Sequence, residues 1–254
     1  MATGRSLNKD ARVYINGFDL SGHARSIGEL AWSFAEGVDD PLNVTIKGTW
    51  LGHATITPGI INAIFDNTAV TGIHAVLSGA PAKRTVLVAQ GIRAAPVDND
   101  PCFGGQFLQI DYKVGPSADP VTVTVTFGQA HAAMSNPLYA EPWGVLLHAL
   151  RAETAVNAAI GLDQGAATSK GGFMVYQVTA GNGTAAIKVQ DAAINADLSF
   201  ADLLSTGLID CSVRQHGIVA LATTAPVRQF VRFQITLGTA TSVTFALGFF
   251  RNYV

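Results

Sequence analysis

The side chains best able to do chemistry in this chain are its histidines and acids, and their spacing forms no catalytic or metal-binding motif. The six histidines are scattered singly along the sequence: His23, His53, His74, His131, His148 and His216. None belongs to an H-E-x-x-H pair, and none adjoins a G-x-S-x-G nucleophile turn. A lone histidine in a β protein is usually a hydrogen-bonded structural residue. We therefore name no catalytic residue and expect the protein not to be an enzyme.

Two acidic clusters offer carboxylate oxygens of the kind that bind calcium. They are Asp39-Asp40 and Asp98-Asn99-Asp100, and a proline directly follows each. No loop supplies the remaining oxygen ligands in order, and proline after the acids favours a turn. Cys102 and Cys211 lie far apart without C-x-x-C spacing, which indicates buried apolar residues or incidental thiols. We expect no metal and no cofactor.

One glycine pattern resembles a dinucleotide-binding fingerprint. Gly181, Gly183 and Ala186 spell G-x-G-x-x-A. The fingerprint needs a helix N-terminus immediately afterwards to hold the pyrophosphate, whereas Ile187 and Val189 alternate as in a strand. A nucleotide site is therefore disfavoured.

The basic residues do not cluster with aromatic residues, and the formal net charge is −2, so nucleic-acid binding is not indicated. Four arginines give the C-terminal part a modest positive bias: Arg214, Arg228, Arg232 and Arg251. Arg228 and Arg232 are expected on the same face of one strand, where their guanidinium groups could bond carboxylates of a neighbouring subunit. The alternative is that both are ordinary surface arginines.

A second candidate contact is the stretch "VTVTVTF" at residues 121–127. Successive side chains of a strand leave opposite faces, so the valines predict a core face. Thr122, Thr124 and Thr126 then share the opposite face. Their short uncharged hydroxyls suit water, the wall of a channel or close contact with another sheet. We take them, with Arg228 and Arg232, as candidate subunit-interface residues.

The composition also favours a covered surface. Only 13% of the 254 residues are charged, and 26 are glycines. A soluble monomer normally carries about twice that share of charge. The alternative is simply a compact β protein. No apolar run approaches the roughly 18 residues that span a bilayer, and the N-terminus has no apolar signal region, so we expect synthesis in the cytoplasm and no membrane.

Alternation of apolar and polar residues dominates the chain and predicts antiparallel sheets with one buried face. The clearest runs cover residues 106–114, 226–238 and 243–250. A hairpin is the simplest connection at Gly238–Thr241. Asn182-Gly183 suits a tight type I′ turn and predicts a second hairpin.

A short helix is predicted near residues 58–66, because Pro58 suits a first helical position and Ile60, Ile61 and Ile64 form one stripe. The fold class is all-β, with two β-sandwich or barrel-like domains and this one flanking helix. The expected division is an N-terminal β domain at 1–139, a linker or extended arm at 140–171 and a C-terminal β-sandwich at 172–254.

Two stretches resemble the major tail proteins of long-tailed bacteriophages. Residues 11–34 contain an N-G-F-D-L-S-G turn between two strand-like runs. Residues 180–203 are similar to a V-Q-D/H-S-x-D-x-x-x-F-x-D-L pattern of phage virion β domains, but depart from it at Ala192, where serine is frequent. Together the two stretches cover about a fifth of the chain. The N-terminal one resembles the opening of a tail-tube domain.

The resemblance implies a structural virion protein of the phage tail, made in the host cytoplasm. Copies would close into rings, trimeric or hexameric, and the rings would stack into a tail tube that contacts other tail proteins and lets DNA pass without specific binding. The alternative is a virion decoration or carbohydrate-binding β-sandwich, which would expose aromatic side chains along a groove. The available candidates are Trp32, Trp50, Trp143 and Tyr176. A hydrolase is disfavoured, because no set of residues supports one.

Overall fold

The computed structural model describes residues 8–39, 48–58, 60–92, 94–115, 120–129, 141–158 and 160–252. These residues form antiparallel sheets with one short α-helix, as the alternating pattern predicts. No helix in the described ranges is long and apolar enough to cross a bilayer.

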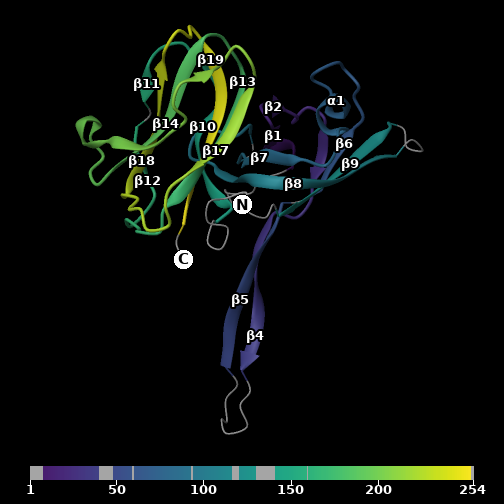
Figure 1. Ribbon diagram of the computed structural model, residues 1–254, viewed down its shortest axis with the longest axis horizontal. Helices are drawn as coiled ribbons and strands as arrows, with labels where there is room; N and C mark the ends of the chain where they lie inside the picture. The colour runs from purple at the N-terminus through teal and green to yellow at the C-terminus, as the bar shows by residue number, and fades with distance from the viewer. Residues whose placement is uncertain are drawn as a thin grey trace.

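The largest sheet contains eleven strands. Its main path runs through β17 (Gln215–Ala220), β13 (Gly172–Gly181), β19 (Val243–Arg251), β10 (Trp143–Glu153), β8 (Pro101–Gly115), β7 (Lys83–Gln90), β1 (Ala11–Ile15) and β2 (Phe18–Asp19). A branch leaves β8 through β9 (Thr122–Gln129), β6 (Ile60–Ile64) and β3 (Ala24–Ile27). We call the part up to β9, apart from β4 (Ala31–Asp39) and β5 (Gly48–Thr57), the N-terminal lobe and the part from β10 onward the C-terminal lobe (Figure 1).

The branch buries its inner face in the first hydrophobic core. Val123, Val125 and Phe127 of β9 lie on this face, as expected from the valine alternation, and they are at most 5% exposed. Helix α1 (Ile73–Leu77) contributes Ile73, Val76 and Leu77 to the same core. A short 3₁₀ turn, η1 (Asn8–Asp10), precedes β1.

The C-terminal lobe is a β-sandwich. Its second sheet contains β11 (Asn157–Ala158), β12 (Leu162–Asp163), β14 (Thr184–Ala192), β15 (Ala201–Ser205), β16 (Ile209–Asp210) and β18 (Phe230–Leu237), with the 3₁₀ turn η2 (Asp197–Ser199) before β15. This sheet packs on β10, β13 and β19 across the second hydrophobic core, which includes Ile187, Val231 and Phe233. The predicted sandwich in this part of the chain is therefore present.

Strand β19 is buried on both faces, because it belongs to both cores. Phe245 and Leu247 face the second core, whereas Ala246 and Phe250 face the first. It pairs with β10 on one side and β13 on the other. Both cores thus depend on β19.

Both predicted hairpins are wrong, because the paired runs lie in different sheets. β13 belongs to the large sheet and β14 to the sandwich's second sheet, and the same holds for β19 and β18. The turns are arches that cross between sheets. Gly183 does take the expected positive φ of 58°. Asn182 fastens the two arches together, since its Oδ1 accepts from Thr241 N at 2.8 Å and its Nδ2 donates to Thr241 Oγ1 at 2.8 Å.

The helix predicted at residues 58–66 is also wrong. Ile60–Ile64 is strand β6, paired with β3 and β9. Ile61 and Ala63 are buried while Ile64 is 39% exposed, which is the two-residue period of a strand. The short helix lies later in the chain, at α1.

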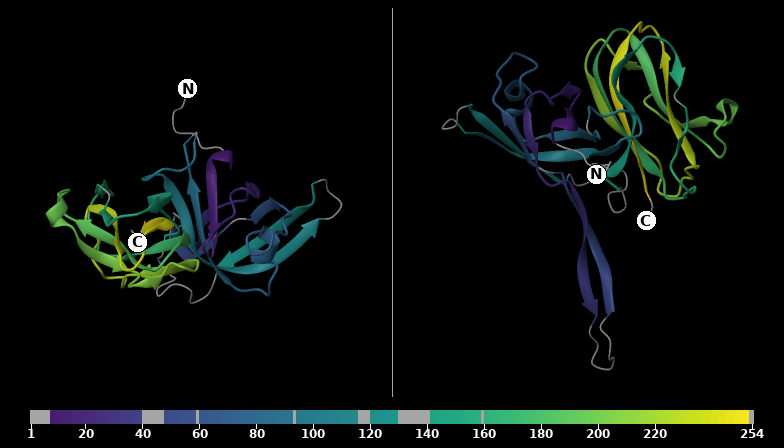
Figure 2. Two further views of the ribbon diagram at one scale, coloured as in Figure 1. Left: turned by 90° about the horizontal axis from the view of Figure 1, so that it is seen from above. Right: turned by 180° about the vertical axis from the view of Figure 1, so that it is seen from behind.

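The segment 140–171, expected to be a linker or arm, contains three strands instead. β10 pairs with both β8 and β19, so it is a structural member of the large sheet. The arm of the molecule is elsewhere. β4 (Ala31–Asp39) and β5 (Gly48–Thr57) form a two-stranded sheet that projects away from both lobes (Figures 1 and 2).

Candidate functional site: an exposed sheet face and two polar clusters between the lobes

The candidate interface threonines lie where the alternation places them, on the outer face of β9. Each is partly exposed. The neighbouring residues continue a polar row across three strands, because Thr124 Oγ1 bonds Asn62 Oδ1 at 3.1 Å and Asn62 Nδ2 donates to Ser26 Oγ at 3.0 Å. β9 is hydrogen-bonded to β6 and β8 on its two sides. Contacts through this face therefore use side chains and not the addition of a strand.

Apolar and charged residues border the same row. Leu108 and Ile64 are each 39% exposed, and Ile110, at a bulge in β8, is 56% exposed. Asp111 and Lys113 form an ion pair on β8 opposite the threonines. We call this surface the threonine face: Ser26, Asn62, Ile64, Leu108, Ile110, Asp111, Lys113, Thr122, Thr124 and Thr126. It combines small hydroxyls, a few exposed aliphatic side chains and a single internally paired charge couple.

The two candidate arginines do not share a strand face as expected. Arg228 precedes β18 and is exposed, while its backbone N–H donates to Asp191 Oδ2 at 2.7 Å. Arg232 is only 7% exposed and bonds within its own chain, to Gln190 Oε1 at 3.0 Å and Asp197 Oδ1 at 2.7 Å. Its guanidinium also lies 4.1 Å from the centre of the Phe200 ring. Arg232 therefore already has its carboxylate partner inside the subunit.

The aromatic candidates for a carbohydrate groove give no exposed row. Trp143 is half-buried and meets Phe103 edge-on, with 5.2 Å between ring centres. Tyr176 is half-buried against the second core, and burial raises its pKa. The side chains of Trp32 and Trp50 lie outside those that the structure describes.

The structure also contains two polar clusters, each with a fully buried member, that sequence reasoning missed. The first, which we call the Gln177 cluster, joins β13 and β17 to the β1–β2 turn and β7. Gln177 is fully buried, its Oε1 accepts from Gly17 N at 2.6 Å and its Nε2 donates to Thr85 O at 2.9 Å. Asn16 Oδ1 accepts from Thr85 N at 2.9 Å, and His216 Nδ1 lies 3.0 Å from Thr85 Oγ1. Burial, and then the nearby Arg84 cation, lower the pKa of His216.

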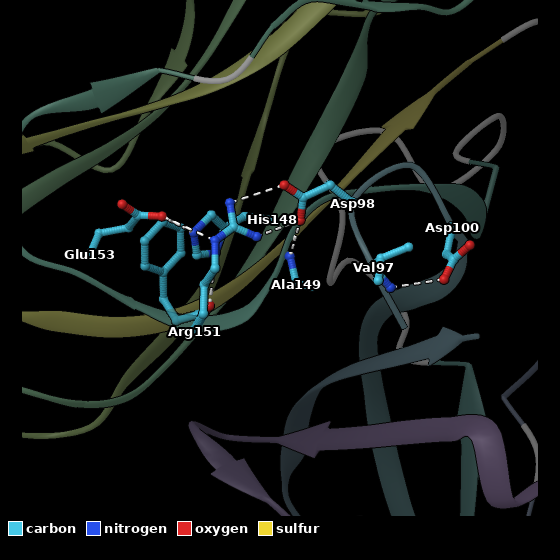
Figure 3. Close-up of polar contacts among 8 residues, drawn as sticks. Val97, Asp98, Asp100, His148, Ala149, Arg151 and Glu153 are labelled. Carbon is cyan, nitrogen blue, oxygen red and sulfur yellow. Dashed lines mark hydrogen bonds and ion pairs between the residues drawn. The ribbon is translucent and has the colours of Figure 1, made fainter. Parts of the chain in front are cut away.

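The second group, the His148 cluster, holds the loop before β8 against β10 (Figure 3). Arg151 makes a two-pronged bond to Asp98, at 2.7 and 3.0 Å, and its Nε donates to Glu153 Oε1 at 3.1 Å. Glu153 Oε1 also lies 2.9 Å from His148 Nε2. Ala149 N donates to Asp98 Oδ1 at 2.7 Å. The Asp98–Asp100 stretch, expected to be a solvated turn, is therefore part of a contact between the lobes.

His148 is the innermost member of this cluster. It is 0% exposed, its ring is stacked on Phe245 with 3.9 Å between centres, and it meets Phe233 edge-on. Its Nδ1 lies 3.0 Å from the backbone oxygen of Phe245. Burial lowers the pKa of His148, opposed by its bond to Glu153.

Neither cluster, nor the rest of the described chain, groups three or more potential metal ligands. Cys102 and Cys211 are free and buried, as the sequence suggested, and burial raises the pKa of both thiols. The threonine face offers a surface for contacts, and the two polar clusters hold the lobes together by hydrogen bonds.

Comparison with known proteins gives a distant structural similarity. No protein-family model matches it, and no curated protein matches it. Among solved structures, it is similar to the Dit protein of phage SPP1, described as a paradigm of the hub adsorption apparatus in phages that infect Gram-positive bacteria. The two share 11% sequence identity and a TM-score of 0.31, over 96% of this chain and 99% of that one.

Proposed function

We propose that this chain is a structural, non-enzymatic subunit of a phage tail that associates with copies of itself into a ring. The observation that carries the proposal is the β4–β5 arm. Its two strands pair with each other, and no further strand pairs with either one in the described ranges. An isolated two-stranded sheet is marginally stable in water, so an arm of this length gains stability by lying against a neighbouring subunit.

The threonine face supports the same proposal. A broad outer sheet face with hydroxyls and exposed Leu108 and Ile110 suits contact with another sheet or with the wall of a channel. The ion pair that it contains, Asp111 with Lys113, is satisfied within the face. Low overall charge is tolerable when copies cover one another.

The finer form of the proposal is the tail tube, in which rings stack and DNA passes through the lumen. A formal net charge of −2 fits such a conduit, because a wall without dense positive charge does not grip phosphates through counterion release. The distant neighbour is described as part of a hub apparatus, and a hub ring is the other position that this subunit could take in a tail. Tubes in solution would indicate the first position and discrete rings the second.

The competing function is a decoration or carbohydrate-binding β-sandwich. Trp143 and Tyr176, the two aromatic candidates whose side chains are described, are half-buried and do not favour it.

The test is the oligomeric state of the purified full chain, measured by light scattering after size exclusion and by negative-stain imaging. We expect rings or tubes for the natural chain. Thr124→Arg places a charged, bulky side chain in the threonine face and should leave monomers with unchanged far-ultraviolet circular dichroism. Thr224→Arg, at an exposed position of the C-terminal lobe, is the matched control and should assemble normally. A natural chain that stays monomeric at high concentration contradicts the proposal.

A further inference from the structure

The C-terminal lobe holds three aliphatic side chains out into solvent at one place. Ile194 and Leu198 belong to the segment between β14 and β15, which includes η2, and Ile160 belongs to the segment beside it. Leu198 is fully exposed, and Ile160 and Ile194 are 82% and 67% exposed. Asn195 Nδ2 donates to Gly161 O at 3.0 Å, which keeps the two segments together. We call Ile160, Ile194 and Leu198 the apolar knob.

The backbone that carries the apolar knob is firmly held. The ring of Phe200 lies against Gly161, where an added Cβ would be 2.3 Å from it, and the Arg232 guanidinium lies 4.1 Å from the ring centre. Arg232 also bonds Asp197 Oδ1 at 2.7 Å, next to Leu198 in the chain. A loop that is already ordered loses little conformational entropy when it docks, so this surface is suited to binding.

The N-terminal lobe has a hollow beside the threonine face. Its volume is about 270 Å³, and it is lined by the α1–β7 loop and by residues 109–112 of β8. The pairing of β7 with β8 ends at Lys83 and Leu108, so the next residues of β8 face this loop instead of a strand. Pro81, Ile110 and Tyr112 supply apolar parts of the wall. A hollow of this size holds several water molecules, which an aliphatic side chain can displace.

The apolar knob and the hollow lie at opposite ends of the subunit. Figures 1 and 2 show the segment around η2, in green, at the far end of the C-terminal lobe, and α1 with the β8–β9 branch at the far end of the N-terminal lobe. One subunit therefore cannot place its own knob in its own hollow. When two different surfaces meet between copies, the contact is head-to-tail, and its repetition closes into a ring if the rotation allows.

Opposite charges lie beside the two surfaces. Asp197 precedes Leu198, and its side chain is largely exposed although its Oδ1 bonds Arg232. Lys83 is exposed at the start of β7, opposite Leu108, and has no acidic partner among the residues that the structure describes. An acid beside the knob and a cation beside the hollow steer the two surfaces toward each other.

We propose that the apolar knob of one copy docks in the hollow beside Ile110 of the next copy, with Leu198 as the central side chain. The inference rests on the proposed function, because it names the surfaces through which copies in the ring meet. The occupant of the hollow is a second copy, since both surfaces belong to this chain, lie at its two ends and carry opposite charges beside them.

Two variants each block one surface. Leu198→Glu places a charge in the apolar knob, and Ile110→Glu places one at the hollow. Both positions are exposed, so folding should be unchanged, which far-ultraviolet circular dichroism checks. Leu198→Ser and Ile110→Ser are milder replacements that keep the test available if glutamate disturbs the fold.

Leu208→Glu is the matched control for these variants. Leu208 is also strongly exposed and belongs to the same lobe. It lies near Gly238, whose N–H donates to Thr184 O at the start of β14, whereas the apolar knob follows the end of β14. The same substitution at this position should therefore leave assembly unchanged.

Analytical ultracentrifugation of the full chains, alone and mixed, provides the test. We expect rings or tubes from the natural chain and from Leu208→Glu, and monomers from each blocked variant alone. An equal mixture of the two blocked variants should give dimers and nothing larger, because one intact knob meets one intact hollow and the other two surfaces are blocked. Lys83→Glu, added to the Leu198→Glu chain, should weaken these dimers about tenfold, since attraction to Asp197 becomes repulsion.

The outcomes separate this contact from the ring itself. If the natural chain stays monomeric, the proposed ring is wrong and the contact is wrong with it. If the natural chain assembles and either blocked variant assembles as well, the ring stands and the contact proposed here is overturned; this is the result expected if another tail protein covers the knob. A mixture of monomeric blocked variants that forms no dimers also overturns the contact.

Discussion

Single buried side chains fix the relation between the two lobes. Gln177 comes from a strand of the C-terminal lobe, yet both of its bonds go to backbone groups of the N-terminal lobe, Gly17 N and Thr85 O. Both residues are buried, and the loss of Gln177 would leave Gly17 N without this partner, whereas Thr85 O would still accept from Asn16 N at 3.0 Å. One side-chain amide thus links its strand to backbone groups that are 160 and 92 residues away in sequence.

We expect Gln177→Leu to lower the free energy of unfolding by about 3 kcal/mol, because two buried backbone groups lose a hydrogen bond and leucine offers none. Urea denaturation followed by tryptophan fluorescence measures the change. Gln229→Leu is the control, since Gln229 bonds Asp163 at the surface and its loss should cost no more than about 0.5 kcal/mol. Equal losses in the two variants would show that the Gln177 cluster has no special role.

The alternation of apolar and polar residues predicted which face of a strand is buried, but it did not predict these clusters. Val123 and Val125 are buried and the threonines between them partly exposed, as alternation requires. Asp98 and Arg151, by contrast, are 53 residues apart and meet only because β8 and β10 are neighbours. No pattern in the sequence around either residue predicts this contact. Arg232 lies on a strand, as the alternation predicts. Its partner Asp197 could not be inferred, because Asp197 lies in the η2 turn, 35 residues away in sequence.

At the scale of elements, the close approach of β10 and β19 depends on glycine. A Cβ added at Gly144 of β10 would lie 2.2 Å from Phe249 O of β19. No real Cβ approaches a backbone oxygen so closely, and backbone on both sides must shift to admit one. The small residue is required by the sheet and not by a turn.

Gly144→Ala should therefore destabilise the protein by about 1–3 kcal/mol, the usual cost of overpacking. Thermal unfolding followed by circular dichroism is a suitable measurement. Gly79→Ala makes the same chemical change where a new Cβ meets nothing within 4 Å, and it should leave the melting temperature nearly unchanged. An unchanged melting temperature in Gly144→Ala would contradict the close approach of β10 to β19 at this position.

The errors in predicting elements have a common physical cause. Asn182-Gly183 signals a tight change of direction, and Gly183 has the positive φ it implies, but a tight turn is compatible with either a hairpin or an arch. Which one forms depends on strands that are distant in sequence. β13 pairs with β17 and β19 and not with β14. At β6, Ile60, Ile61 and Ile64 fit a helical stripe, whereas pairing with β3 and β9 imposes a strand. Tertiary pairing overrode local propensity.

At the scale of the whole molecule, the arm is a sheet of its own. In the described strands, β4 and β5 pair with each other and with no strand of the two lobes. Glu36 of β4 lies opposite Leu51 of β5, and the arm continues beyond this pair to Asp39 and Gly48. Among the arm residues whose side chains the structure describes, Ile56 at the base belongs to the first core.

Joining Glu36 to Leu51 by an Asn-Gly turn should shorten the arm without unfolding the subunit, because a two-residue turn fits between paired strand ends. We expect a melting temperature within a few degrees of the natural chain, and loss of rings in negative-stain images. Rings that form as before would show that the arm is not a contact between subunits.

The position of β19 has a consequence for how the protein is made. A ribosome delivers residues 243–251 after β10 and β13, yet those residues close the space between these two strands and contribute to both cores. Until they emerge, the nascent chain exposes the apolar flanks of two unfinished lobes, so neither can mature while the other waits. Both lobes should therefore complete their folding only once β19 has been made, and a chain cut before Val243 should lose both lobes together.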